Sequence, residues 1–199
     1  EAGIQLVRAR ARSEPDHRRH LCLGGLGELA SVCSLPRPAP ATGPLRADGI
    51  ARQREVRGDG EVVGEGLVNA IAAALGDAGI EPGELGHVNA GATGSPEEDS
   101  IEARAIERAL GDSATSVPVT ALAGYLGHSD AGSGAVELAG CLLAAGHRLV
   151  PFTRGFRSLA DGCRLDIVSD TARVGTSSLG LSCNRTEFGQ SAAVVIRAE

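Results

Sequence analysis

The feature that most restricts the fold is the alternation of short apolar segments with helical repeats from residue 67 onward. Apolar residues spaced i, i+4 and i+8, first at Leu67, Ile71 and Leu75, predict an Ala-rich helix that ends before Gly79 and Pro82. Further helices are predicted at 96–110 and about 130–145, and strands at 87–90, 117–120, 178–183 and 191–196. Alternating strands and helices indicate an α/β layered fold whose loops carry the site.

Two of the predicted helices have distinctive sequences. The helix at 96–110 has a strong start, because Ser95 can cap it, Pro96 takes the first helical position and Glu98 completes a capping box. The helix at 130–145 is apolar on most sides. A helix without a polar face is expected inside a layered protein.

The first 66 residues have weaker patterns. We expect an Arg-rich helix over 1–20, a short strand over 20–26, a proline-rich loop over 34–48 and a strand-turn-strand edge over 53–66. The sequence begins at Glu1 and has no methionine, so we expect a processed, trimmed or incompletely recorded chain.

Composition excludes several classes of protein. The chain has 25 acidic residues against 19 basic ones, all arginine, and only 2% aromatic residues, which disfavours nucleic-acid binding. No apolar stretch is long enough for a membrane span. Five cysteines without a C-x-x-C pair predict reduced thiols, no metal site and a cytoplasmic location. The core must be built from Ala, Val, Ile and Leu.

Two loops resemble one known family. Residues 89–103, NAGATGSPEEDSIEA, are similar to the segment N-A-H-G-T-G-T-P-x-x-D-x-x-E-A of β-ketoacyl synthases. Residues 118–137, PVTALAGYLGHSDAGSGAVE, are similar to that family's P-V-x-x-x-K-x-x-x-G-H-x-x-x-A-a-G-a-v-E. Weaker matches lie at residues 23–25, 59–66 and 188–196.

The resemblance implies a thiolase-like fold, in which two similar halves form alternating α and β layers. The family is about twice as long as this chain. Residues 1–66 would then be a remnant of the N-terminal ketosynthase half, and residues 67–199 the C-terminal half. The chain would begin just after the turn that carries the family's nucleophilic cysteine, and a segment would be missing between Gly66 and Leu67.

The resemblance also implies decarboxylative condensation of acyl thioesters, with a cysteine thiolate, two neutral histidines and no cofactor. His128 matches the second histidine. Gly91 stands at the position of the first histidine, and Ala123 at that of a supporting lysine. No cysteine has the setting of a nucleophile; Cys22, Cys33 and Cys141 are interpreted as core or loop residues. The chain alone is therefore expected not to catalyse condensation.

Other positions are assigned by the same loops. Thr93, Gly94, Phe188 and Gly189 are candidate substrate-binding residues. Asp99 and Glu102 lie three apart on one helix face, which allows acid–base chemistry but favours a structural role in tying down the loop.

The substitution at Gly91 yields a geometric prediction. Gly91 and His128 should lie within about 10 Å of each other at the base of a pocket lined by Ala, Leu and Val, near Phe188. Glycine at position 91 should leave a gap the size of an imidazole ring.

Three functions follow from the sequence. The first is a non-catalytic subunit similar to the chain-length factors of polyketide systems, paired with an active ketosynthase or with itself, and served by an acyl carrier protein. The second is an incomplete record of an active β-ketoacyl-[acyl-carrier-protein] synthase, favoured by His128. The third is a thiolase-fold scaffold or lipid-binding module without enzymatic activity.

Overall fold

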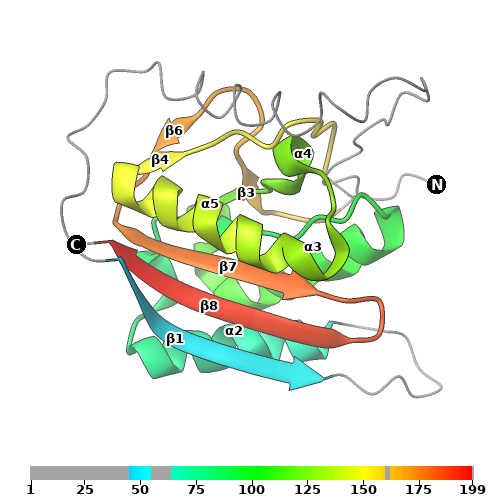
Figure 1. Cartoon of the computed structure of the whole chain (residues 1–199), viewed down its shortest axis with the longest axis horizontal. Coiled ribbons are helices and arrows are strands. Elements are labelled where there is room, and N and C mark those ends of the chain that lie inside the picture. Colours follow the sequence, from blue (N-terminus) through cyan, green and yellow to red (C-terminus); the bar gives the residue numbers. More distant parts are fainter. Residues whose placement is uncertain (1–44, 55–63, 160–161, 199) are drawn as a thin grey trace.

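The computed structural model describes residues 45–54, 64–159 and 162–198. Figure 1 shows helices packed around one central sheet. The helices are α2 (Glu65–Ala78), α3 (Pro96–Leu110), α4 (Ala123–Leu126) and α5 (Ser133–His147), with 3₁₀ turns at Pro82–Glu84, Gly111–Thr115 and Asp130–Gly132. The strands are β1 (Leu45–Arg54), β2 (His87–Asn89), β3 (Pro118–Thr120), β4 (Leu149–Val150), β5 (Asp166–Ile167), β6 (Arg173–Val174), β7 (Leu179–Arg185) and β8 (Gln190–Ala198).

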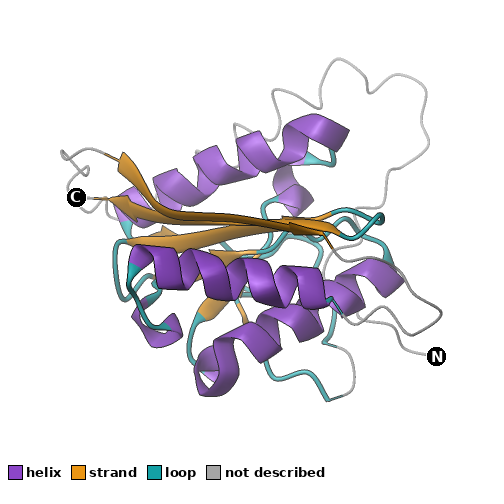
Figure 2. Ribbon diagram, turned by 90° about the horizontal axis from the view of Figure 1, so that it is seen from below, coloured by secondary structure: helices purple, strands orange, loops and turns teal. Residues whose placement is uncertain are grey.

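The main sheet has six strands in the order β1-β8-β7-β2-β3-β5. Strands β7, β2, β3 and β5 run parallel, and β8 is antiparallel to both of its neighbours, β7 and β1. Figure 2 shows the sheet edge-on, with α2 and α3 on one face and α5 on the other. The predicted α/β layered architecture is confirmed.

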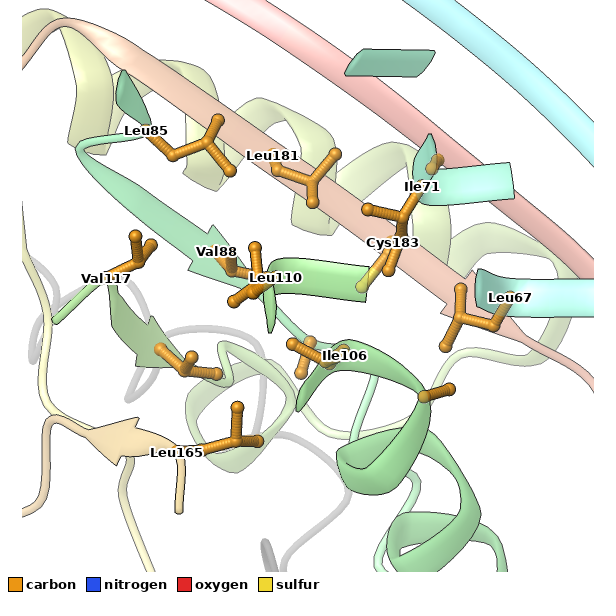
Figure 3. Packing of buried hydrophobic residues seen from close by; sticks show 14 of the residues in the cluster. Leu67, Ile71, Leu85, Val88, Ile106, Leu110, Val117, Leu165, Leu181 and Cys183 are labelled. Carbon is orange, nitrogen blue, oxygen red and sulfur yellow. The ribbon is translucent and has the colours of Figure 1, made fainter. Parts of the chain in front are cut away.

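The core is aliphatic. On one face of the sheet, Leu67 and Ile71 of α2 and Ile106 of α3 meet Val88 and Leu181 of the strands, as Figure 3 shows, and all five are fully buried. On the other face, α5 contributes the buried Cys141 and Ala145, which pack with Ile196 and Ala198 of β8. Alanines, valines, leucines and isoleucines make up most of the buried hydrophobic residues, as the composition predicts.

The helix from Pro96 to Leu110 has the predicted ends, but its capping box is wrong. The Ser95 side chain makes no capping hydrogen bond, and only the Ser95 carbonyl accepts, from the Asp99 N–H at 2.8 Å. The Glu98 side chain instead forms an ion pair with Arg185 of β7. An ion pair with a distant strand has taken the place of the expected local hydrogen bonds of the capping box.

Two of the N-terminal predictions are wrong in part where the structure describes them. The predicted loop over 34–48 overlaps β1, which begins at Leu45 because its residues pair with β8 in the register Leu45↔Ala198. The predicted edge over 53–66 ends in helix instead, since α2 begins at Glu65. A domain division between residues 66 and 67 falls inside α2. The predictions for 1–20 and 20–26 lie outside the described residues.

Only one side of helix α5 faces the sheet. Its buried residues, Glu137 and Cys141 among them, face the strands, whereas Val136 and Leu143 are 47% and 60% exposed. The expectation of a fully enclosed helix is therefore wrong for this chain. Within the described ranges, no helix is both long and apolar enough to cross a membrane.

Candidate functional site

The candidate site lies where three parallel strands end. Strand β2 pairs with β3 through Asn89↔Thr120 and with β7 through Asn89↔Ser182, so the residues that follow these strands share one edge of the sheet. Ligand sites of open α/β sheets lie at this edge. The sequence predicts that the loops carrying the site converge, and this arrangement of neighbouring parallel strands is what would bring them together.

The loop after β2, residues 90–95, is held by two carboxylates of α3. Buried Glu102 accepts hydrogen bonds from the N–H groups of Gly91 at 2.9 Å and Ala92 at 2.8 Å. Asp99 accepts from the Gly94 N–H at 3.2 Å and from the Thr93 hydroxyl at 3.5 Å. These hydrogen bonds tie the loop to α3, and they occupy both oxygens of Glu102.

The same loop carries backbone strain. Ala92 has a φ of 40°, in the left-handed region that disfavours side chains other than glycine. Such a conformation persists only where the surroundings hold it, and the bond from Ala92 to Glu102 is one such restraint. The loop is therefore preorganised by α3.

Asn89 joins the loops after β2 and β3. Its side-chain Oδ1 accepts a hydrogen bond from the Leu122 N–H at 3.1 Å. The Ala90 N–H donates in turn to the Thr120 carbonyl at 2.9 Å. Ala123, the residue in place of the supporting lysine, is buried one residue beyond Leu122, at the start of α4.

Glu137 of α5 is the second buried acid of the site. Its carboxylate accepts a hydrogen bond from the Asn184 side-chain amide at 2.7 Å. Burial is the main cause that raises the pKa of Glu137 to about 7; the charge of the nearby Glu102 acts in the same direction, while the hydrogen bond from Asn184 and the Asn89 amide oppose the rise. Glu137 thus changes charge near neutral pH.

Glu102 is perturbed in the same direction. Burial raises its pKa, and the hydrogen bonds from Ala92 and Gly91 together with the charge of Arg185 oppose that rise. The Arg185 side chain is 3% exposed and pairs with Glu98. Two buried carboxyls and one buried guanidinium therefore set the electrostatics of this edge.

No described cysteine is an activated thiol. Burial raises the pKa of Cys141, of Cys163 and of Cys183. Cys141 contacts the Nε2 of His87 at 3.2 Å, but burial lowers the pKa of His87 to about 4, so that ring stays neutral and does not stabilise a thiolate as a cation. Cys22 and Cys33 lie outside the described residues.

His128 differs from its predicted surroundings. It lies between α4 and α5, and its Nδ1 is 3.4 Å from the hydroxyl of Ser133, the first residue of α5. The His128 side chain is exposed, and Phe188 is 70% exposed at the turn joining β7 and β8, next to Gly189. The prediction that His128 lies at the base of a pocket is therefore wrong for the described residues, while its predicted distance from Gly91 stays a prediction.

The predicted gap at Gly91 is also wrong. A Cβ atom on Gly91 would lie 3.0 Å from Nδ2 of Asn184 and 3.1 Å from Oε1 of Glu102, closer than ordinary contact. The Asn184 amide fills the room beside Gly91. A histidine does not fit there unless Asn184 or Glu102 moves.

Comparison with known proteins identifies the family of this chain. The model of the β-ketoacyl synthase C-terminal domain matches residues 49–157, more than half of the chain. The chain belongs to the β-ketoacyl synthase family. The match begins in β1 and includes residues on both sides of the predicted division at residue 66.

The family relatives come from polyketide and fatty-acid synthesis. The tetracenomycin polyketide synthase ketoacyl synthase alpha subunit of Streptomyces glaucescens is 37% identical over 136 residues, covering 67% of this chain and 32% of the relative. The 3-oxoacyl-[acyl-carrier-protein] synthase 2 of Synechocystis is 35% identical, over 63% of this chain and 30% of the relative. The chain thus spans about a third of the length of these two relatives.

Solved ketosynthases share the fold. The ishigamide ketosynthase/chain length factor has a TM-score of 0.70 and 25% identity, over 77% of this chain and 38% of that one. A β-ketoacyl synthase from Burkholderia phymatum has a TM-score of 0.71 and 21% identity, over 78% and 38% of the two chains. The thiolase-like fold expected from the two loops is confirmed.

Sequence reasoning assigned no role to Glu137 or Asn184. Glu137 ends the second loop that resembles the family, residues 118–137, and it is the single acid in the otherwise uncharged first three turns of the helix from Ser133. Asn184 had no such signal, because its role depends on the side chains it meets across the sheet.

Proposed function

We propose that this chain is part of a ketosynthase-family subunit that assists the decarboxylative condensation of acyl thioesters without supplying the reacting groups, in the manner of a chain-length factor. The observation that carries the proposal is the absence of a histidine at position 91. The family pattern has a histidine there, whereas this chain has glycine with the Asn184 amide against it.

The chemistry of condensation supports this assignment. The reaction needs a thiolate to hold the acyl chain and imidazole donors to stabilise the developing negative charge. The described thiols have raised pKa values, and burial is the main cause for each. Of the two expected imidazoles only His128 is present, and Ala123 cannot replace a lysine.

The exposed face of α5 supports an assembly with a ketosynthase. Val136 and Leu143 present apolar surface on the side of α5 that faces away from the sheet. A partner that covers this face would remove both side chains from water. We propose an active ketosynthase subunit as that partner and an acyl carrier protein as the carrier of the substrate; the ketosynthase/chain length factor among the structural neighbours is an assembly of this kind.

A second candidate is an active synthase whose nucleophile lies outside the described residues. His128 favours it, because a subunit that takes no part in the chemistry does not need this side chain. The intact mass of the natural protein, compared with the 20.2 kDa of this chain, shows whether it contains further residues that could supply a nucleophilic cysteine.

The proposal is tested by thiol labelling. The purified protein is treated with a thiol-reactive analogue of an acyl thioester, and the modified peptides are mapped by mass spectrometry. We expect no site-selective labelling in the folded protein and labelling of all five cysteines after denaturation, which is the control. Stoichiometric labelling of one cysteine in the folded protein would contradict a non-catalytic role.

A further inference from the structure

The Asn184 side chain occupies a slot between two glycines. On one side, a Cβ on Gly91 would lie 3.0 Å from Nδ2 of Asn184. On the other side, a Cβ on Gly134 of α5 would lie 2.9 Å from Oδ1 of the same amide. The distance at Gly134 is shorter than real Cβ atoms show, and the distance at Gly91 is tighter than most real Cβ contacts, so the amide keeps this position because positions 91 and 134 lack side chains.

In this slot the Asn184 amide donates a hydrogen bond to Glu137. Nδ2 of Asn184 donates to the Glu137 carboxylate at 2.7 Å, which links the end of β7 to α5. The same Cβ on Gly91 would lie 3.1 Å from Oε1 of Glu102, whose carboxylate accepts from the Gly91 and Ala92 N–H groups. Two side chains, each engaged in hydrogen bonds of its own, therefore restrict the space at position 91.

We propose that Asn184 is a positioning residue that closes the site at position 91 and stabilises the ionised form of Glu137. On this view, glycine at position 91 is needed for the Asn184–Glu137 hydrogen bond, and it also replaces the histidine of the family pattern. A side chain at position 91 must displace the amide, and the bond to Glu137 weakens with it. The inference does not depend on the proposed function, because it rests on packing and hydrogen bonding within the chain.

The groups around Glu137 act on its pKa in opposite directions, and the hydrogen bond from Asn184 is one of those that lower it. Glu102 of α3 raises the pKa of Glu137 by its negative charge, and the Asn89 amide of β2 and the Asn184 amide of β7 lower it. The thiols of Cys183 on β7 and Cys141 on α5 lie in the same region and have raised pKa values, so they add no charge. Loss of the Asn184 bond therefore moves the titration of Glu137 to higher pH.

The coupling is tested with a double-mutant cycle. Gly91→Ala is made in the natural chain and in the Asn184→Ala background, with Asn184→Ser as a second background that keeps the result decisive if Asn184→Ala does not fold. Gly132→Ala is the matched control, because a Cβ there meets only the Cβ of Ser129, at an ordinary 3.7 Å. The equilibrium constant of unfolding is measured by urea denaturation.

We expect Gly91→Ala to raise the unfolding constant about tenfold in the natural chain, as for overpacking of a filled core. The effect should be at least threefold smaller once Asn184 is truncated, because the Cβ then has room on that side. The ¹³C carboxyl signal of Glu137, assigned by its absence in Glu137→Gln, should titrate at higher pH in Gly91→Ala and Asn184→Ala than in Gly132→Ala. A difference below threefold between backgrounds, or an unchanged Glu137 titration in Asn184→Ala, overturns the proposal.

Discussion

Replacing Glu137 by glutamine should stabilise the protein at alkaline pH. Burial raises the pKa of Glu137 from 4.5 to about 7, so the folded state binds this proton more tightly than the unfolded state does. For an acid shifted in this direction, stability is full below pH 4.5 and falls as the pH rises through 7. The shift of about 2.5 pKa units costs the folded state about 3 kcal/mol once the pH is above both values.

Glutamine removes that cost, because it is neutral at every pH and its Oε1 still accepts from the Asn184 amide. We expect Glu137→Gln to differ from the natural chain by less than about 1 kcal/mol at pH 5 and to be up to about 3 kcal/mol more stable at pH 8. Urea denaturation followed by circular dichroism at pH 5, 6, 7 and 8 measures the difference. Glu97→Gln, on the exposed first turn of α3, is the control, and its difference should stay constant. A Glu137→Gln difference that is constant with pH would refute the reasoning.

Three further predictions concern other parts of the fold. Arg148 ends α5 with a φ of 48°, so Arg148→Gly should raise stability by about 1 kcal/mol, seen as a melting temperature about 3 °C higher; no rise would mean that the turn is unstrained. Glu98→Gln should cost about 2 kcal/mol in urea denaturation, because it leaves the guanidinium of Arg185, 3% exposed, without its carboxylate; a neutral result would contradict the role of the pair. Leu143→Glu should leave the chain's own stability within about 0.5 kcal/mol, since Leu143 is 60% exposed, yet weaken the complex with a ketosynthase in light scattering; unchanged assembly would separate this face from the partner.

The local patterns of the sequence predicted the elements around the site well. The helix ends at Gly79 and Gly111 are where the sequence places them, and both glycines have the positive φ that favours a residue without a side chain. Strand β1 was missed in part, because its pairing with β8 joins residues about 150 positions apart and the preceding prolines suggested a loop. The spacing of apolar residues along a segment does not show which distant strand it pairs with.

The contacts of the site were harder to predict. The carboxylates Asp99 and Glu102 stand out in the sequence because they lie three apart on one helix face, and their hydrogen bonds are with the preceding loop. The gap at Gly91 was inferred from the absence of a side chain there. It is filled by Asn184, 93 residues later, and only the folded sheet brings the two together.

The central claim, that this chain does not itself carry out the condensation, is tested most directly by product formation. The protein is incubated with an acyl and a malonyl carrier-protein thioester, alone and with an active ketosynthase, and the 3-oxoacyl product is measured by mass spectrometry. We predict no product from the protein alone, and product from the mixture that persists when His128 is replaced by alanine. Product formed by the protein alone and lost in His128→Ala would contradict the account.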